Sequence, residues 1–179
     1  MNKKLYAITL TFDKSTNDKL LSVWDVLKQN YKIKYICSRS PMPHLTLISG
    51  RLKKKIDINK IKKKKFKKFH LKPLGLGIFA NDLPLIYLRW EKNKNIYKLY
   101  KSLEKITQKN FLKDKNYSAY LRWIPKTSLA FKDLKYKDLA KILKKINFIN
   151  SLKNAKVEYI KILEVDKSGE KIYSSLKLI

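Results

Sequence analysis

The sequence predicts an α+β fold in one domain that spans residues 1–179, and three observations lead to this prediction. Short β-branched and aromatic segments alternate with segments of helical periodicity, but without the regular strand–helix–strand order of a parallel sheet. No Pro-, Gly- or Ser-rich linker divides the chain, whose length suits one domain. The hydrophobic fraction is 44%, which is enough to form a core and excludes a fully disordered chain.

The N-terminal half is expected to begin with a strand at Leu5–Phe12. This apolar stretch is too short for a signal peptide, and Asp13 closes it. Ser15-Thr16-Asn17 is expected to cap a helix, whose apolar face would hold Leu20, Trp24, Leu27 and Tyr31. The patterns that follow predict short strands at Ile33–Cys37 and His44–Ile48, and a short basic helix over 57–68.

In the C-terminal half, Leu71–Phe79 and Leu85–Trp90 are predicted to pair, because Ala80-Asn81-Asp82 forms a turn signal between them. Apolar residues spaced by three and four predict two helices, along Ile96-Leu99-Tyr100-Leu103-Ile106 and Leu139-Ile142-Leu143-Ile146. Strands are predicted at Tyr120–Ile124 and Ser128–Phe131, with a closing hairpin from Val157–Val165 and Ile172–Leu178 around Asp166-Lys167-Ser168-Gly169.

The net charge of +29 indicates a polyanionic partner such as RNA, DNA or anionic lipid. Only four of the 43 basic residues are arginine, so codon drift in an A/T-rich genome is an alternative explanation of the lysine excess. No apolar run approaches the roughly 18 residues of a membrane span, so we expect no membrane partner and a cytoplasmic location. The single cysteine, Cys37, excludes an internal disulfide framework and a cysteine-rich zinc site.

One segment, Pro43-His44-Leu45-Thr46-Leu47, could carry chemistry. On a strand, His44 and Thr46 point to one face, and the two leucines point to the other. An imidazole can move a proton and a neighbouring hydroxyl can orient an oxyanion. A histidine and a threonine on a solvated strand face are the alternative, because the spacing alone is weakly specific.

About eighty residues later, Pro125-Lys126-Thr127-Ser128-Leu129 repeats the order of proline, basic residue, any residue, hydroxyl residue and leucine. Lys126 and Ser128 would share a strand face, as His44 and Thr46 do. Two strands that carry such pairs could flank one phosphate.

With these two segments the sequence resembles the 2H phosphoesterases, the group that contains bacterial and archaeal RNA 2′,3′-cyclic phosphodiesterases, also called 2′-5′ RNA ligases. Members carry two H-x-[S/T] motifs about eighty residues apart. The order of the other elements is similar too, including Leu74-Gly75-Leu76-Gly77-Ile78-Phe79, which resembles a GLGxF segment, and the Trp123-Ile124-Pro125 lead-in to the second motif. The resemblance covers nearly the whole chain.

The resemblance implies two pseudo-symmetric lobes, each an antiparallel sheet with helices outside, around a central cleft. It implies hydrolysis of a cyclic or 2′-5′ phosphodiester at an RNA end or in a nucleotide, with no metal and no other cofactor. His44, Thr46, Lys126 and Ser128 would be the catalytic residues. In the family the two histidines act as acid and base, so His44 would protonate the leaving sugar oxygen. We expect a monomer.

The chain departs from the family at Lys126, which stands where the second histidine is expected. A free lysine is almost fully charged at pH 7, whereas a free histidine is mostly neutral. Lys126 is therefore better suited to clamp the phosphate than to act as a base. A base or acid role after a large shift of its pKa, and plain loss of catalysis, are the alternatives.

Other residues are weaker candidates. Arg51 and Arg122 could clamp phosphate, and Tyr120 or Trp123 could stack on a base, although core packing is the commoner role of such aromatics. His70 has no counterpart in the family motifs and is expected at a strand edge. Ten lysines within 53–68 could track a phosphate backbone, form a solvated helix face or, less well supported, lie on a membrane surface.

Three hypotheses follow, and we favour the first. The protein is a 2H-type hydrolase, with turnover put in doubt by Lys126. It could instead be a catalytically degenerate RNA- or nucleotide-binding protein of the same fold. A basic α+β domain without cleft chemistry is the third.

Overall fold

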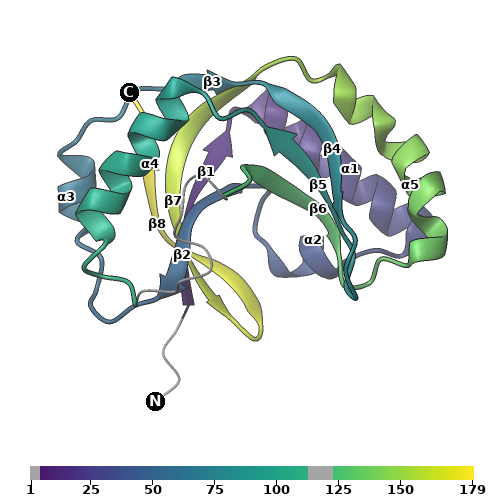
Figure 1. The fold of residues 1–179 in the computed structure, drawn as a ribbon, viewed down its shortest axis with the longest axis horizontal. Helices are drawn as coiled ribbons and strands as arrows, with labels where there is room; N and C mark the ends of the chain where they lie inside the picture. Colours follow the sequence, from purple (N-terminus) through teal and green to yellow (C-terminus); the bar gives the residue numbers. More distant parts are fainter. Residues whose placement is uncertain (1–4, 113–122) are drawn as a thin grey trace.

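Two antiparallel sheets form the centre of the fold in the computed structural model, which describes residues 5–112 and 123–179 (Figure 1). In the five-stranded sheet, strands run in the order β2-β1-β7-β3, and β8 also pairs with β7. These strands are β1 (Leu5–Phe12), β2 (Leu45–Arg51), β3 (Phe69–Leu71), β7 (Ala155–Asp166) and β8 (Gly169–Lys177). The three-stranded sheet has the order β4-β5-β6, from β4 (Pro73–Phe79), β5 (Leu85–Trp90) and β6 (Lys126–Phe131).

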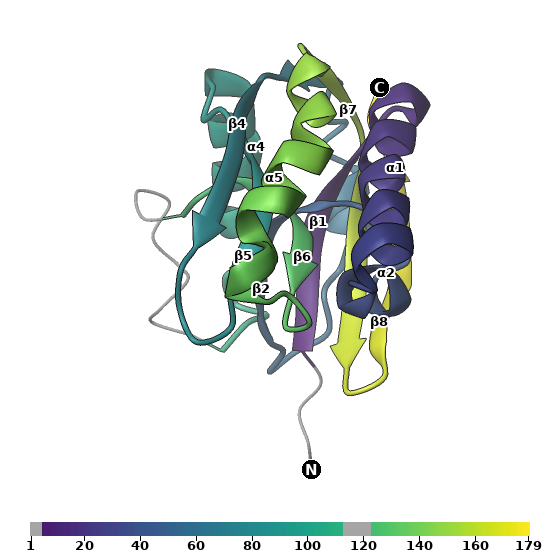
Figure 2. The ribbon, with the colours of Figure 1, turned by 90° about the vertical axis from the view of Figure 1, so that its right-hand side faces the viewer.

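The helices cover the two sheets from outside, and each of the two longest helices packs against the sheet other than the one that holds the strand preceding it. Helix α1 follows β1 but packs against β6 and α5, whereas α4 follows β5 but packs against β2 and α3. Figures 1 and 2 show α1 and α5 on the side of the three-stranded sheet, with α3 and α4 on the opposite side. The helices are α1 (Lys14–Tyr31), α2 (Tyr35–Arg39), α3 (Ile58–Lys62), α4 (Lys94–Thr107) and α5 (Leu139–Ile146), with short 3₁₀ turns η1 (Tyr136–Asp138) and η2 (Asn147–Ser151).

A single hydrophobic core connects both sheets and the helices. Leu10 and Leu45 from the larger sheet and Leu88 and Trp90 from the smaller sheet are fully buried. The rings of Phe12 and Trp90 lie 4.7 Å apart and join the two sheets directly. The predicted α+β class and the pair of antiparallel sheets with outer helices are therefore confirmed.

The predicted strand at Ile33–Cys37 is wrong, because Tyr35–Arg39 forms helix α2. The prediction relied on β-branched and aromatic residues at this point. A distant carboxylate decides otherwise: Asp133 accepts hydrogen bonds from the backbone N–H groups of Lys34 and Tyr35, each at 2.7 Å. These contacts satisfy donors that the start of a helix leaves free.

The predicted strand Leu71–Phe79 and its pairing with Leu85–Trp90 are confirmed from Pro73 onwards, but Leu71 belongs to a separate strand, because the chain changes sheet between Leu71 and Pro73. Strand β3 pairs with β7, and β4 pairs with β5 from Pro73 onwards. The first helix begins directly at Lys14 with Asp13 at its N-cap, so Ser15-Thr16-Asn17 lies within the helix and caps nothing. Asp13 is fixed there because its N–H donates to the carbonyl of Lys156 in β7, at 2.8 Å.

Two further predictions change in extent. The basic helix over 57–68 is shorter, at Ile58–Lys62, and Asp57 caps it by accepting from the N–H groups of Asn59 and Lys60. Of the predicted strand Tyr120–Ile124, residues 120–122 lie outside the described part of the chain, and Trp123 and Ile124 are not in a strand. The remaining strands, the helices α4 and α5, and the closing hairpin form where the sequence predicts them, within a few residues.

Candidate active site

A small pocket of about 170 Å³ lies between the two sheets, and all four residues predicted as catalytic line it. We call it the His44 pocket. Its lining comes from β2, β6, helices α1 and α2, and the β7–β8 hairpin. The lining residues are Trp24, Ile36, Ser40, His44, Thr46, Lys126, Ser128 and Glu170.

The two motif segments enter the pocket with the alternation that a strand imposes. Leu45 and Leu47 are buried, while His44 and Thr46 reach the pocket. In β6, Thr127 and Leu129 are buried, while Lys126 and Ser128 reach it. The hydroxyl residues thus approach from different sheets, and strands β2 and β6 are in contact.

The similarity between the His44–Thr46 and Lys126–Ser128 segments extends to their backbone. Strand β2 shifts register against β1 immediately after Thr46, so that Leu47 has no partner in the pairing. Strand β6 shifts register against β5 in the same way after Ser128, at Leu129. Each shift has the form of a β-bulge, a device that re-aims side chains next to active sites. The two segments with similar sequence therefore lie in two strands that each have a register shift directly after the hydroxyl residue.

Two tryptophans fix the motif strands from the side. The indole N–H of Trp24 in α1 donates to the backbone carbonyl of Ser128, at 3.4 Å. The indole N–H of Trp123 donates to the carbonyl of Thr46, at 3.0 Å. Each half of the chain therefore supplies one indole that holds the hydroxyl residue of the other half.

The imidazole of His44 is oriented through its Nδ1 atom. This nitrogen lies 3.1 Å from the carbonyl oxygen of Met42 and 3.4 Å from Ser40 Oγ. A carbonyl can only accept, so Nδ1 carries the proton and Nε2 is the nitrogen left for proton transfer. Sequence reasoning identified the histidine but missed Ser40, because no strand or helix pattern covers it.

Glu170 is a pocket residue that sequence reasoning missed. Its Oε2 lies 3.9 Å from His44 Nδ1, and the two side chains are 23% and 15% exposed. Among the described residues, this oxygen is buried without a hydrogen-bond partner. The only sequence signal was an acid directly after a turn glycine in a chain with few acids.

The hairpin that carries Glu170 is fastened to α2. The Arg39 guanidinium donates to the backbone carbonyls of Asp166 and Lys167. Gly169 has φ of +139°, and a Cβ there would lie 2.6 Å from the carbonyl oxygen of Arg39. Only glycine fits this close approach between the hairpin and α2. The approach determines where Glu170, the next residue, lies in the pocket.

Lys126 is half-buried, and this burial lowers the pKa of its ammonium group. Its Nζ lies 5.6 Å from the centre of the Phe79 ring, a distance at which the ring face attracts a cation. Within residues 5–112 and 123–179, no carboxylate lies within ion-pair distance of Lys126. Among the described residues Lys126 therefore has no ion-pair partner, and an anionic ligand in the pocket can supply one.

The other predicted binding residues lie elsewhere. Arg51 is exposed at the far end of β2 and does not line the pocket. Trp123 lies behind β2, where it contacts Tyr100 at 5.7 Å between ring centres. Tyr120 and Arg122 fall outside the described residues. His70 is exposed on β3 and is not part of the pocket.

Two further features concern metals and membranes. In the described ranges, no group of three or more His, Cys, Asp or Glu side chains could hold a metal ion. None of the described helices combines the length and the hydrophobicity needed to cross a membrane.

The two facing antiparallel sheets with outer helices form the 2H phosphoesterase fold that the sequence resemblance implied. Solved structures with this architecture include TT0787 of Thermus thermophilus, at 12% identity, 97% coverage of both chains and a TM-score of 0.62. Escherichia coli LigT in apo form is 8% identical, with 98% of this chain and 97% of LigT covered and a TM-score of 0.57.

The complex of E. coli LigT with 3′-AMP gives 9% identity, 98% coverage of both chains and a TM-score of 0.56. At these identities the comparison establishes the fold, and a fold alone does not define a function. No protein-family model and no curated protein matches the sequence.

Proposed function

We propose that the protein is a metal-independent 2H-type phosphodiesterase that opens a 2′,3′-cyclic phosphate at an RNA end, or hydrolyses a cyclic or 2′-5′-linked nucleotide. The observation that carries the proposal is the shared lining of the His44 pocket by an imidazole, two hydroxyls and an ammonium group. The nucleotide 3′-AMP bound to LigT supports a ligand of this class.

The size of the pocket fits one phosphodiester group. At about 170 Å³ it is smaller than the roughly 300–1,000 Å³ typical of pockets that enclose a whole small molecule. The base and most of the sugar would then lie outside. One histidine and one carboxylate are fewer than the three protein ligands of a typical catalytic zinc site, so the proposed chemistry uses side chains.

In the proposed reaction, water attacks phosphorus, and the bond from phosphorus to one sugar oxygen breaks. Nε2 of protonated His44 donates its proton to that oxygen, and Glu170 stabilises the imidazolium before transfer. Thr46 and Ser128 hold the non-bridging oxygens, and Lys126 offsets the charge that develops on them. The water hydroxyl stays on phosphorus, and the proton lost by water restores His44 through solvent.

Hydrolysis of 2′,3′-cyclic AMP by purified protein tests the proposal. Removal of a general acid typically costs about 100-fold or more, so His44→Ala should lose at least that factor in kcat. His70→Ala is the matched control, because His70 is an exposed histidine outside the pocket. Equal activity of His44→Ala and wild type would refute the proposed site.

A binding protein without turnover is the second candidate, and Lys126 is the observation that favours it. The variant Lys126→His discriminates the two candidates. A gain of activity would show that the pocket is competent and that lysine limits it. No gain, together with salt-dependent binding of a 3′-phosphorylated oligoribonucleotide by wild type, would favour the binding protein.

A further inference from the structure

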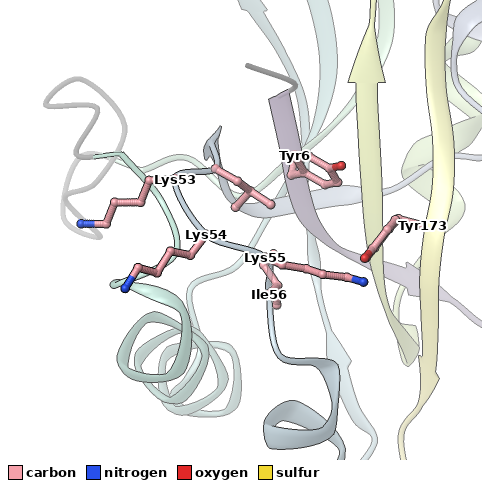
Figure 3. A pocket seen from close by; sticks show the side chains of 7 residues that line it. Tyr6, Lys53, Lys54, Lys55, Ile56 and Tyr173 are labelled. Atoms are coloured by element: carbon pink, nitrogen blue, oxygen red, sulfur yellow. The ribbon is translucent and has the colours of Figure 1, made fainter. Parts of the chain in front are cut away.

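A second hollow lies outside the His44 pocket, at the other end of β2. It measures about 350 Å³, and Figure 3 shows it between the loop after β2 and the side chains of Tyr6 and Tyr173. We call it the lysine hollow. It is lined by Tyr6, Leu52, Lys53, Lys54, Lys55, Ile56 and Tyr173, and it shares no residue with the His44 pocket.

The three lysines stand on a fixed backbone. The N–H groups of Lys53 and Lys54 donate to the carbonyl of Asn110, at 2.8 and 3.3 Å. The Asn110 side-chain amide donates in turn to the carbonyl of Lys55, at 2.6 Å. Ile56 is buried and anchors the end of the loop. The backbone that carries the three lysines is therefore held in place before any ligand arrives, which lowers the backbone entropy lost on binding.

The lysines point in two directions from this loop. In Figure 3, Lys55 extends towards Tyr173, while Lys53 and Lys54 extend away from it on the other side of the loop. All three residues are exposed, and in the described part of the chain none of them pairs with a carboxylate. Together they form a basic strip suited to successive phosphates of one strand.

The opposite wall of the lysine hollow is aromatic. The rings of Tyr6 and Tyr173 lie 5.6 Å apart at 85°, an edge-to-face pair. The Tyr6 hydroxyl donates to Glu164 at 2.7 Å, and this bond, with burial and the nearby carboxylate charge, raises the pKa of Tyr6 to about 12. The pair therefore presents fixed, neutral rings, and Tyr173 is 37% exposed. Bases stack on such rings in proteins that bind single strands.

Strand β8 connects the lysine hollow to the His44 pocket. Glu170 lines the pocket and Tyr173 lines the hollow, about 10 Å apart along the strand. Because side chains alternate along a strand, the two residues point to opposite faces of the five-stranded sheet, so a bound chain passes around the end of the sheet, where Leu5 and Glu170 both pair with Val165. Between them, Lys171 and Ile172 are exposed on this strand. A stacked strand advances by about 3.4 Å per nucleotide, so the roughly 10 Å between these two residues already takes three or four nucleotides, and the path around the end of the sheet adds to that number.

We propose that the lysine hollow binds the single-stranded nucleic acid chain that leads away from the reacting phosphate. This inference rests on the proposed function for the end held in the His44 pocket, and it assigns a polynucleotide as the substrate class. An oligonucleotide long enough to reach Lys53–Lys55 binds more tightly than a dinucleotide, whereas a mononucleotide fills the His44 pocket alone.

The test measures the affinity of wild-type protein for a labelled 12-nucleotide single-stranded RNA with a 3′-phosphate, and for the corresponding dinucleotide, at several salt concentrations. The hollow variant is Lys53→Gln/Lys54→Gln/Lys55→Gln. The control is Lys62→Gln/Lys63→Gln/Lys64→Gln, which removes the same charge from exposed lysines of the same lysine-rich run. Circular dichroism and thermal melting verify that both variants fold.

We expect the hollow variant to bind the 12-mer about ten-fold more weakly, and the control to change by less than about three-fold. Loss of three phosphate contacts should also reduce the slope of log affinity against log salt by about two. Tyr173→Ala should weaken 12-mer binding by about five-fold through lost stacking. The 12-mer should bind wild type at least ten-fold more tightly than the dinucleotide.

An equal loss in both triple variants would overturn the proposal, because diffuse charge would then explain RNA binding. No loss in the hollow variant, or no preference for the 12-mer, would overturn it as well. Hydrolysis of 2′,3′-cyclic AMP by wild type is assayed separately. If hydrolysis is absent while 12-mer binding depends on Lys53–Lys55, the proposed function fails and the lysine hollow stands.

Discussion

Trp123 allows a sharp separation of two roles, base stacking and support of the active site. Its indole N–H donates to the carbonyl of Thr46 at 3.0 Å, and its ring contacts Tyr100. The substitution Trp123→Phe keeps an aromatic ring that could stack on a base, but it removes the N–H donor. Trp123→Ala removes both.

The size of the effect follows from the lost hydrogen bond. A fully buried acceptor left without its partner costs about 1–3 kcal/mol, and because Thr46 and Trp123 are half-buried we expect a loss of about 1 kcal/mol. In a protein of this size, 1 kcal/mol lowers the melting temperature by about 2–4 °C, so Trp123→Phe should melt at least about 2 °C lower. A displacement of Thr46 by about 1 Å can reduce kcat by up to about 100-fold.

Thermal melting and hydrolysis of 2′,3′-cyclic AMP are the assays. If Trp123 supports Thr46, Trp123→Phe should lose kcat nearly as severely as Trp123→Ala, with KM little changed. If stacking is its role, the phenylalanine variant should keep kcat and the alanine variant should raise KM. The second result would refute our assignment of Trp123 to positioning.

Three further predictions concern the pocket and its supports. Burial lowers the pKa of Lys126 below 10.5, so Lys126→Met should raise the melting temperature at neutral pH, where the buried charge is costly. The gain in melting temperature should shrink as the pH rises to 10.5, because the lysine then loses its charge. A gain that stays constant with pH would contradict this prediction. Glu170→Gln should reduce kcat about ten-fold, equivalent to about 1.4 kcal/mol. The same variant should lower KM, because it removes a negative charge from the phosphate site near His44. An unchanged kcat would contradict the role of Glu170. Gly169→Ala should destabilise the protein by about 1–3 kcal/mol in urea titrations, because the alanine would combine backbone strain with a close contact to α2. Gly75→Ala is the control, because Gly75 has φ of +95° but open space where a Cβ would lie, and it should cost less. Equal losses of stability would show that the contact with α2 is unimportant.

The local spacing of apolar and polar residues predicted much of the fold, because most helices and strands bury one face and expose the other. Helix α4 and the closing hairpin follow from the spacing of their apolar residues alone. Helix α2 could not be predicted, because Asp133 provides its N-terminal acceptor from almost a hundred residues away. The change of sheet near Pro73 was hidden for a similar reason, since strand partners are set by tertiary structure.

The candidate site divides in the same way. The residues that line the His44 pocket from β2 and β6 were predictable because a strand repeats its facing every second residue. Glu170 was not, because its place depends on how a hairpin bends and where Arg39 fastens it. Trp123 was singled out for stacking, yet in the structure its indole holds the Thr46 backbone.

The exchange of α1 and α4 between the two sheets limits how the protein can unfold or open. Each helix covers strands from the opposite half of the chain, so a fragment cut near residue 72 would lose the cover of its own sheet. Neither half should be a stable folding unit, and denaturation should follow a single cooperative transition. The two halves are also poorly placed to swing apart, so entry of a substrate into the His44 pocket should not depend on their separation.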